Sequence, residues 1–324
     1  MNRIRIGVDV GGTNAEAVAL AAGGRVVASA RRATRIGPDG VVDTVRGLVA
    51  ELADGRRELV SVGVGIPGIV ADGTVRHAVN LDLRETDLAA ALRGRLAVPV
   101  AIDNDVRAAA LGAHATQGGS LAYLNLGTGI AAGIVTDGTV RRGASGAAGE
   151  IGHIPIDPVG PVCACGQRGC IEAFAGGAAI ARRWHATEPA LAGVVGAHAA
   201  ARTPTDVSPA LSAADRPLAI PPAALVVFDA ADAGDERAIR IRDDAVHAIA
   251  AAARILVLAT DVERVVLGGG VSRLGERLRG AVARELDRAA AASPFLTELR
   301  LADRIDREPA FSHVPAIGAA LLPG

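Results

Sequence analysis

The chain has 324 residues, of which 50% are hydrophobic and only 2% aromatic, and its net charge is −1. The length fits about two domains, while the balanced charge argues against a nucleic-acid partner and the few rings argue against an aromatic stacking platform. The sequence has no signal-peptide pattern and no apolar stretch of about 20 residues, so we expect a cytoplasmic protein that binds no membrane. It contains no lysine, which excludes a catalytic lysine.

The first third of the chain predicts strands that alternate with helices. The strands are apolar and rich in β-branched residues, and the helices carry apolar side chains at helical spacing. Strands are expected at residues 4–10, 15–20, 25–30, 60–66 and 98–102, and helices at 39–54, 88–96 and 106–115. The last of these strands delivers Asp103, Asn104 and Asp105 at its carboxyl end, where open α/β sheets bind their ligands.

A glycine-containing hairpin opens the chain and recurs in its second half. The first copy turns at residues 9–14 (DVGGTN), and the second at residues 127–129 (GTG), between strands expected at 121–126 and 130–135. A single turn of this kind is usually only a hairpin, although its unshielded amides can bind phosphate oxygens. Two copies about 116 residues apart suggest two related halves that bracket the phosphates of a nucleotide.

The rest of the chain predicts mostly helices. They are expected at residues 173–184, 237–258 and 314–322, with a short strand at 139–140 and a further strand at 263–267 that ends in three glycines. Residues 185–222, rich in Ala, Pro, Thr and Asp, predict helical pieces and loop of little functional weight.

All three cysteines lie in one segment, downstream of a histidine. Cys163, Cys165 and Cys170 follow His153, with glycines between them that allow tight turns. Three thiolates and one imidazole complete the tetrahedral shell of a structural Zn²⁺. Three inert, buried cysteines are the alternative, but that interpretation leaves the spacing unexplained. We therefore predict a zinc site, which also fits a reducing compartment.

These motifs, in this order, resemble the ROK family of sugar kinases and repressors, within the actin-like ATPase superfamily. The resemblance covers nearly the whole chain, and its most specific part is Glu150-Ile-Gly-His153 followed by the cysteines and Glu172. The other motifs are Asp9-x-Gly-Gly-Thr-Asn14, Gly65-Ile-Pro-Gly68, Asn104-Asp105, Leu126-Gly-Thr-Gly129 and Gly268-Gly-Gly270. The resemblance implies an actin-like ATPase (ribonuclease H-like) fold, with two related α/β domains around a central cleft and a zinc-binding loop.

The resemblance further implies an ATP-dependent kinase that phosphorylates the 6-hydroxyl of a hexose, with glucose as the expected acceptor. Asp105 would be the general base, and Asn104 would hydrogen-bond a neighbouring hydroxyl. The residues implied at the sugar are Gly65, Asn80, Asn104, Asp105, Glu150, His153 and Glu172. Those implied at the phosphates are Asp9, Gly11, Gly12, Thr13, Asn14, Gly127, Thr128, Gly129, Gly268, Gly269 and Gly270, with Asp9 holding Mg²⁺ through water.

His153 would then have two roles, because one ring nitrogen would ligate zinc and the other would face the sugar. The metal would be structural, since four protein ligands leave no open position for water. A smaller domain is expected at residues 1–117 plus 311–324, and a larger one at 118–310, carrying the zinc loop 150–172. Related proteins often assemble through the larger domain, so a homodimer or homotetramer is implied.

The chain departs from the family pattern at Asn14, where some relatives have Lys, and at two further places. Asp103 stands where many members carry Glu, and little consequence is expected. Asp82-Leu83-Arg84 replaces the Gly-Trp that often follows Asn80-Leu81, which leaves the choice of hexose open. Fructose, mannose, N-acetylglucosamine and N-acetylmannosamine are alternative acceptors, and polyphosphate is an alternative donor.

Each role also has a plainer alternative. Asp105 is typical of a helix N-cap, Glu150 and Glu172 of solvated loop charges, and Asp9 of a surface turn. A sugar-responsive regulator of the family would carry a helix-turn-helix domain ahead of its sugar-binding part. The first strand, expected near residue 4, leaves no room for one, and no basic stripe replaces it.

Overall fold

The structure is a computed structural model that describes residues 3–53, 55, 57–186, 223–309 and 312–323. The predicted irregular segment 185–222 therefore lies outside the described residues, apart from its first two. No helix within these ranges is long and apolar enough to cross a membrane.

Two five-stranded sheets with the same strand order organise the chain. In the first, β3-β2-β1-β4-β8, strand β2 runs antiparallel to β1 and β3, whereas β4 and β8 continue parallel to β1. The second, β11-β10-β9-β12-β13, repeats these directions strand for strand. The predicted pair of related α/β halves is confirmed.

The strands and helices have the following bounds. The first sheet contains β1 (Arg3–Val10), β2 (Asn14–Ala21), β3 (Val26–Ala33), β4 (Glu58–Ile66) and β8 (Val100–Asn104). The second contains β9 (Leu121–Leu126), β10 (Ile130–Thr136), β11 (Thr139–Val140), β12 (Arg264–Gly268) and β13 (Ile305–Arg307). The helices are α1 (Pro38–Leu52), α2 (Leu88–Arg93), α3 (Asp105–Gln117), α4 (Ile171–Ala175), α5 (Gly177–His185), α6 (Ala223–Asp232), α7 (Glu236–Thr260), α8 (Glu276–Ala290), α9 (Pro294–Glu298) and α10 (Val314–Ala320).

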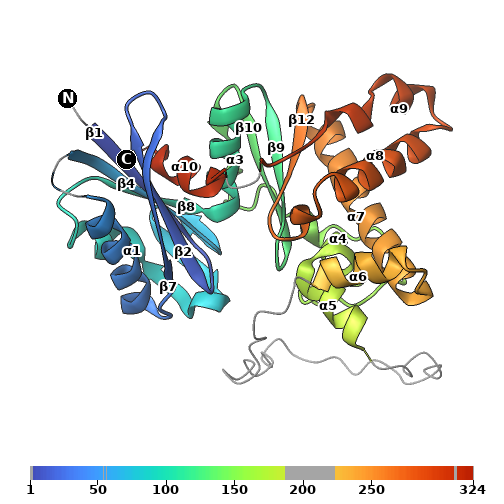
Figure 1. Cartoon of the computed structure of the whole chain (residues 1–324), viewed down its shortest axis with the longest axis horizontal. Helices are drawn as coiled ribbons and strands as arrows, with labels where there is room; N and C mark the ends of the chain where they lie inside the picture. Colours follow the sequence, from blue (N-terminus) through green and yellow to red (C-terminus); the bar gives the residue numbers. More distant parts are fainter. Residues whose placement is uncertain (1–2, 54, 56, 187–222, 310–311, 324) are drawn as a thin grey trace.

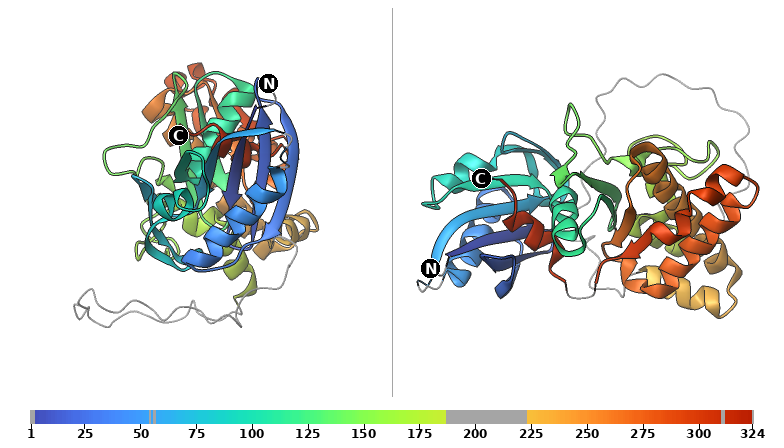
Figure 2. Two further views of the ribbon diagram at one scale, coloured as in Figure 1. Left: turned by 90° about the vertical axis from the view of Figure 1, so that its left-hand side faces the viewer. Right: turned by 90° about the horizontal axis from the view of Figure 1, so that it is seen from above.

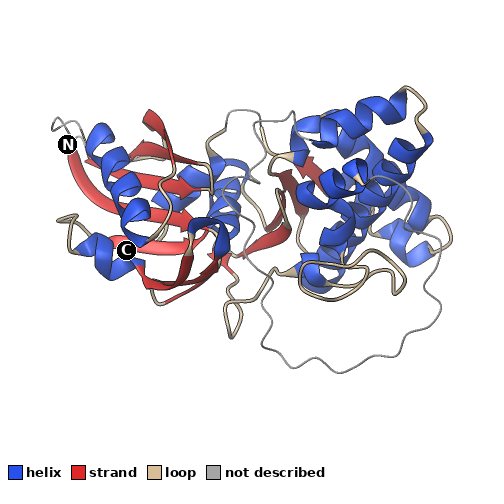
Figure 3. Cartoon of the chain, turned by 90° about the horizontal axis from the view of Figure 1, so that it is seen from below, coloured by secondary structure: helices blue, strands red, loops and turns tan. Residues whose placement is uncertain are grey.

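The layers alternate between helices and sheets (Figure 1). Helix α1 covers one face of the first sheet, α3 and α10 lie between the two sheets, and α7 and α8 pack beyond the second. Viewed from below, most helices of the second half lie on the far side of its sheet (Figure 3). The spacing of Val41, Val45, Leu48 and Leu52, all buried, explains why α1 packs along one face.

Helix α10 belongs spatially to the first half although it ends the described chain (Figure 2). It packs on α3, β1, β2 and β4, on the side of the predicted smaller domain, whose boundaries stay a prediction. Glycines make this approach possible. A Cβ at Gly318 would lie 1.7 Å from the Ala108 carbonyl oxygen, and one at Gly63 would lie 1.8 Å from that of Ala319.

The structure differs from the sequence predictions in several places, among them α8, α9 and β13, which were not predicted. A third sheet, formed by β5 (Ile69–Ala71), β6 (Thr74–Ala78) and β7 (Leu83–Asp87), follows β4 and precedes α2 in the sequence, where no strands were expected. The single helix predicted at 173–184 is divided into α4 and α5, because Gly176 adopts an extended backbone conformation. The break lets the Gly177 and Ala178 amides donate to the carbonyls of Gly127 and Thr128.

Replacing Gly318 with alanine should destabilise the protein, because its methyl group would overlap the backbone of α3. We expect a loss of about 1–3 kcal/mol or more in the free energy of unfolding, measured by urea denaturation. Gly280→Ala in α8 is the matched control, since its Cβ would meet the flexible ends of Arg284, at 3.3 Å, and Glu276, at 3.8 Å. That variant should be at least as stable as the wild type, and equal stability of the two variants would contradict the close-packing interpretation.

Candidate active site

Asp105 lies at the junction of β8 and α3, where the first sheet presents the carboxyl ends of its parallel strands. The helix N-cap is Asn104, whose Oδ1 accepts hydrogen bonds from the Val106 and Arg107 amides at 3.0 and 3.2 Å. Asp105 Oδ1 accepts one from the Val106 amide at 2.9 Å. The capping function expected as the alternative for Asp105 is therefore performed by its neighbour.

Burial raises the pKa of Asp105 to about 6, with Glu150 acting in the same direction and two backbone hydrogen bonds and Arg107 acting against it. A carboxyl group with this pKa is ionised at neutral pH yet remains basic enough to accept a proton. Glu150 belongs to the second half, so its charge acts on Asp105 across the two halves.

Asp9 ends the first strand beside Asp105. A Cβ at Gly65 would lie 3.4 Å from the Asp105 Cα and 3.8 Å from Asp9 Oδ1, so Gly65 leaves the space between the two aspartates open. Burial and, to a smaller extent, the charges of Asp105, Glu16 and Glu308 raise the pKa of Asp9 to about 8. Such a concentration of negative charge favours a bound cation, and carboxylate oxygen is a ligand that Mg²⁺ prefers.

The first glycine turn, residues 11–14, meets the segment that carries Asn80. The Gly11 amide donates to the Asn14 carbonyl at 3.0 Å, which closes the turn between β1 and β2. A Cβ at Gly12 would lie 3.3 Å from the Asn80 Cβ. Residues predicted at the sugar and at the phosphates are thus adjacent in space, as a transfer reaction between two substrates requires.

The second glycine turn, residues 127–129, is supported by the cysteine-containing segment. Glu172 Oε2 accepts a hydrogen bond from the Ile130 amide at 2.9 Å, and α5 donates two backbone hydrogen bonds to the turn. A Cβ at Gly129 would lie 2.4 Å from Glu172 Oε2. One carboxylate oxygen of Glu172 therefore supports the turn, which the sequence did not indicate, and its contact with sugar stays a prediction.

The third glycine turn, residues 268–270, lies beside the second. Gly269 has a φ of 82°, and a Cβ there would lie 2.5 Å from Asn125 Oδ1. One at Gly127 would lie 3.2 Å from Asn125 Nδ2. The side chain of Asn125, a residue that the sequence interpretation did not select, therefore lies between the two turns on the predicted nucleotide side.

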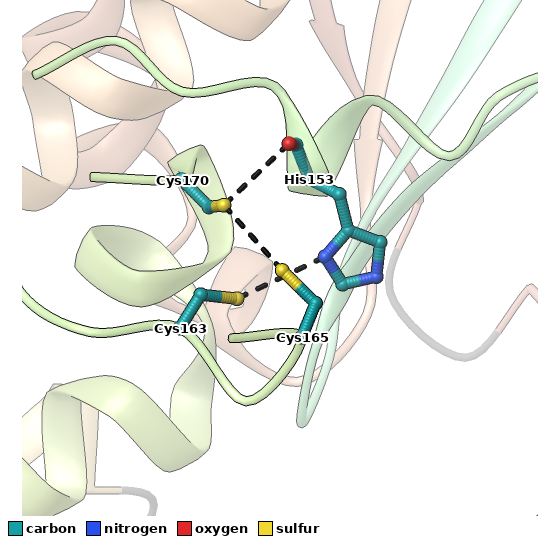
Figure 4. A group of neighbouring side chains, drawn as sticks. All are labelled: His153, Cys163, Cys165 and Cys170. Atoms are coloured by element: carbon teal, nitrogen blue, oxygen red, sulfur yellow. Dashed lines mark hydrogen bonds between the residues drawn. The ribbon is translucent and has the colours of Figure 1, made fainter. Parts of the chain in front are cut away.

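His153, Cys163, Cys165 and Cys170 form the predicted metal cluster (Figure 4). Their ligand atoms all lie within 4.8 Å of one another. The Sγ atoms of Cys165 and Cys170 are 3.7 Å apart, and His153 Nδ1 is 3.8 Å from Cys163 Sγ. Sulfur atoms around a tetrahedral Zn²⁺ are separated by about 3.8 Å, so these residues could bind zinc.

The cluster lies next to the predicted sugar residues. His153 points Nδ1 toward the sulfur atoms, which leaves Nε2 on the other side of the ring (Figure 4). Glu172 Oε1 is 4.0 Å from Cys163 Sγ, and the His153 amide donates to the Glu150 carbonyl. The segment therefore groups Glu150, His153 and Glu172 as predicted, while their contacts with sugar stay predictions. A separate cavity of about 360 Å³ between α8 and α9 contains none of these residues.

Comparison with known proteins identifies the family. The sequence profile of the ROK family matches residues 5–322. The chain belongs to the ROK family. It is 33% identical to a glucokinase from Thermotoga maritima, over 85% of this chain and 84% of that protein.

Solved structures agree with this membership. A ROK hexokinase from Thermus thermophilus has 28% identity and a TM-score of 0.73, over 98% of this chain and 97% of that one. A ROK family glucokinase from Streptomyces griseus, in complex with glucose and AMPPNP, has 27% identity and a TM-score of 0.71, over 98% of each chain. This ROK protein therefore has the actin-like ATPase fold, and its glucokinase relatives support a sugar kinase.

The structure also reveals residues that the sequence interpretation missed. Arg107 at the start of α3 pairs in the buried interior with Asp103, which lies in the preceding strand β8 and not on the same helix. Arg142 reaches the same carboxylate from the second half of the ROK protein. Tyr123 donates to Glu308 at 2.5 Å beside Asp9. The last two contacts join distant segments, which no local pattern encodes.

Zinc removal should destabilise the ROK protein. We expect about one Zn²⁺ per chain by elemental analysis, and Cys165→Ala should lose it and lower the melting temperature by more than about 5 °C. Cys165 is exposed, so its truncation leaves no cavity that would account for this loss. Val159→Ala, at an 85% exposed position in the same segment, is the control and should change neither quantity. A wild-type protein that is purified without zinc and melts at the same temperature after zinc addition would refute the site.

Asp105→Asn should raise the thermal stability at neutral pH. The pKa of Asp105 is raised from 3.8 to about 6, so the folded state binds the proton more tightly and loses stability as the pH rises through this range. The variant avoids that loss. Its advantage in melting temperature should be small below pH 4, grow up to about pH 6 and stay constant above it. An equal melting temperature for both proteins at pH 7 would show that Asp105 is not held in an unfavourable environment.

Proposed function

We propose that this ROK protein is an ATP-dependent hexose kinase that transfers a phosphoryl group to the 6-hydroxyl of glucose, with Asp105 as the general base. The observation that carries the proposal is the position of Asp105. It lies at a strand end beside Asp9, electrostatically coupled to Glu150 of the cysteine-containing half. The proposed base, Asp105, thus lies between the residues proposed to bind the sugar and a glycine turn proposed to bind phosphate.

On the acceptor side, the chemistry needs groups that both accept and donate hydrogen bonds to hydroxyls. Glu150 and Glu172 supply carboxylates, and His153 supplies a ring nitrogen. Asn104 uses Oδ1 for the helix cap and one Nδ2 hydrogen for the Gly68 carbonyl, at 3.1 Å, so among the described residues its second hydrogen has no acceptor and is available to a hydroxyl. The 6-hydroxyl would give its proton to the Asp105 carboxylate as the oxygen attacks phosphorus.

On the donor side, the three glycine turns would offer backbone amides to the phosphate oxygens of ATP. Phosphoryl transfer passes through a loose transition state, in which positioning and charge neutralisation matter more than strong base catalysis. Mg²⁺, held by Asp9 through water, would supply that neutralisation when bound. Arginine is the only cationic side chain besides histidine in this chain, so no lysine takes part.

Glucose is the proposed acceptor because the relatives from Thermotoga maritima and from Halalkalibacterium halodurans, each 33% identical, are glucokinases. The other hexoses and N-acetylhexosamines named above are the competing acceptors. The segment after Asn80, where Asp82 has a φ of 54°, departs from the family pattern and would shape that choice.

A steady-state screen of about ten sugars with Mg²⁺ and ATP tests the proposal. We expect glucose to be phosphorylated with the highest kcat/KM, and Asp105→Asn to lower kcat by about 10²–10⁴-fold while the KM for glucose stays near the wild-type value. Asp87→Asn, at the exposed N-cap of α2, is a control that should retain activity.

Two results would refute parts of the proposal. Failure of the wild type to phosphorylate any sugar would refute the kinase. Comparable kcat values for wild type and Asp105→Asn would refute only the base. Binding of the pure protein to promoter DNA at moderate salt, together with kinase inactivity, would favour the regulatory branch of the family instead.

A further inference from the structure

The carboxylate of Asp103 is shared by two arginines from different halves of the molecule. Its Oδ1 accepts from Arg107 Nε at 2.6 Å and from the Asn104 amide at 2.8 Å. Its Oδ2 accepts from Arg142 Nε at 2.9 Å and Nη2 at 2.7 Å. Both Asp103 and Arg107 are 3% exposed. Each carboxylate oxygen of Asp103 therefore accepts from two donors, directly beside the Asn104–Asp105 pair.

Arg107 uses all three of its guanidinium nitrogens. In addition to Asp103, it donates from Nη1 to the Gly146 carbonyl at 2.9 Å and from Nη2 to the Val70 carbonyl at 3.2 Å. Val70 lies in β5 of the first half, whereas Gly146 lies in the loop that follows β11 of the second. The planar fork of arginine can serve three such acceptors at once, which a lysine ammonium would not reproduce.

The loop formed by residues 141–149 connects this cluster to Glu150. It begins at β11, where the Arg141 amide donates to the Ile134 carbonyl, and it ends where the Ala132 amide donates to the Gly149 carbonyl at 2.7 Å. A Cβ at Gly149 would lie 1.7 Å from the Ala132 carbonyl oxygen, so this end is pressed against β10. Between these fixed ends, Arg142 and Gly146 contact the first half.

We propose that Arg107 and Arg142 are positioning residues that clamp Asp103 between the two halves and thereby fix the Asn104–Asp105 pair relative to Glu150. The proposal deepens the function given above and rests on it. Glu150 and Asp105 belong to different halves, and within the described residues this cluster is a direct ionic link between β8, which leads to Asp105, and the loop that leads to Glu150.

General energetics support a positional role for the cluster. Buried ion pairs add little net stability compared with apolar packing, because desolvation offsets their attraction. Their geometry, by contrast, is strongly directional, since Arg142 donates from two nitrogens to one oxygen of Asp103 and Arg107 donates from one nitrogen to the other oxygen. A displacement of about 1 Å at a reacting group can cost about 10²-fold in rate.

Arg142 offers the cleaner test, because its side chain is 46% exposed whereas Arg107 is buried and its truncation endangers folding. Arg142→Ala should lower kcat/KM for the sugar by about 10–100-fold and leave the KM for ATP within about twofold. Arg142→Lys should recover part of that loss by restoring the charge without the fork. Amide hydrogen exchange of residues 103–107 should be faster in Arg142→Ala than in the wild type.

Arg141→Ala is the matched control, because this neighbouring arginine contacts Thr136 and Asp137 of its own hairpin. It should change neither kinetics nor exchange. If amide exchange at residues 103–107 is as slow in Arg142→Ala as in Arg141→Ala, the clamp is overturned. This test does not depend on kinase activity, because a wild type that is inactive on every sugar would refute only the proposed function. Slower catalysis with unchanged exchange would also overturn it, since Arg142 would then act directly on a substrate.

Discussion

The helices between the two sheets pack at glycine positions, where no side chain separates the two backbones. Helix α10 touches the first sheet at Gly7 and Gly63, and it crosses α3 at Gly318. On its other side α3 touches β10, where a Cβ at Gly133 would lie 2.5 Å from the Val106 carbonyl oxygen. Because backbone packs on backbone here, the strand ends of both sheets come close enough for residues such as Arg142 and Asp103 to form an ion pair. The site depends on this close approach.

The cysteine-containing segment has structural consequences on both sides of the site. It groups Glu150 and His153 on the proposed acceptor side, while Glu172 and the start of α5 support the second glycine turn on the proposed donor side. Burial, followed by the charges of neighbouring carboxylates, raises the pKa of Asp9, an arrangement that costs stability and suits a ligand-binding surface.

Local patterns predicted much of this arrangement. The repeated glycine hairpins indicated two related halves, and the spacing of His153 with the three cysteines indicated their convergence. The sheet β5-β6-β7 was missed because its strands are only three to five residues long and half exposed. The break at Gly176 was missed because its cause is a turn far away in sequence. Asp103 was expected to matter little, since both of its arginine partners become visible only after folding.

The position of α10 also affects how the protein is made. The first half lacks the helix that covers Gly7 and Gly63 until residues 314–320 have been synthesised, so about three hundred residues emerge from the ribosome before its packing is complete. During that interval the face of β1 and β4 that packs on α10 is uncovered. The packing of the amino-terminal half is therefore completed late, and chaperone protection is most valuable for that face of the nascent chain.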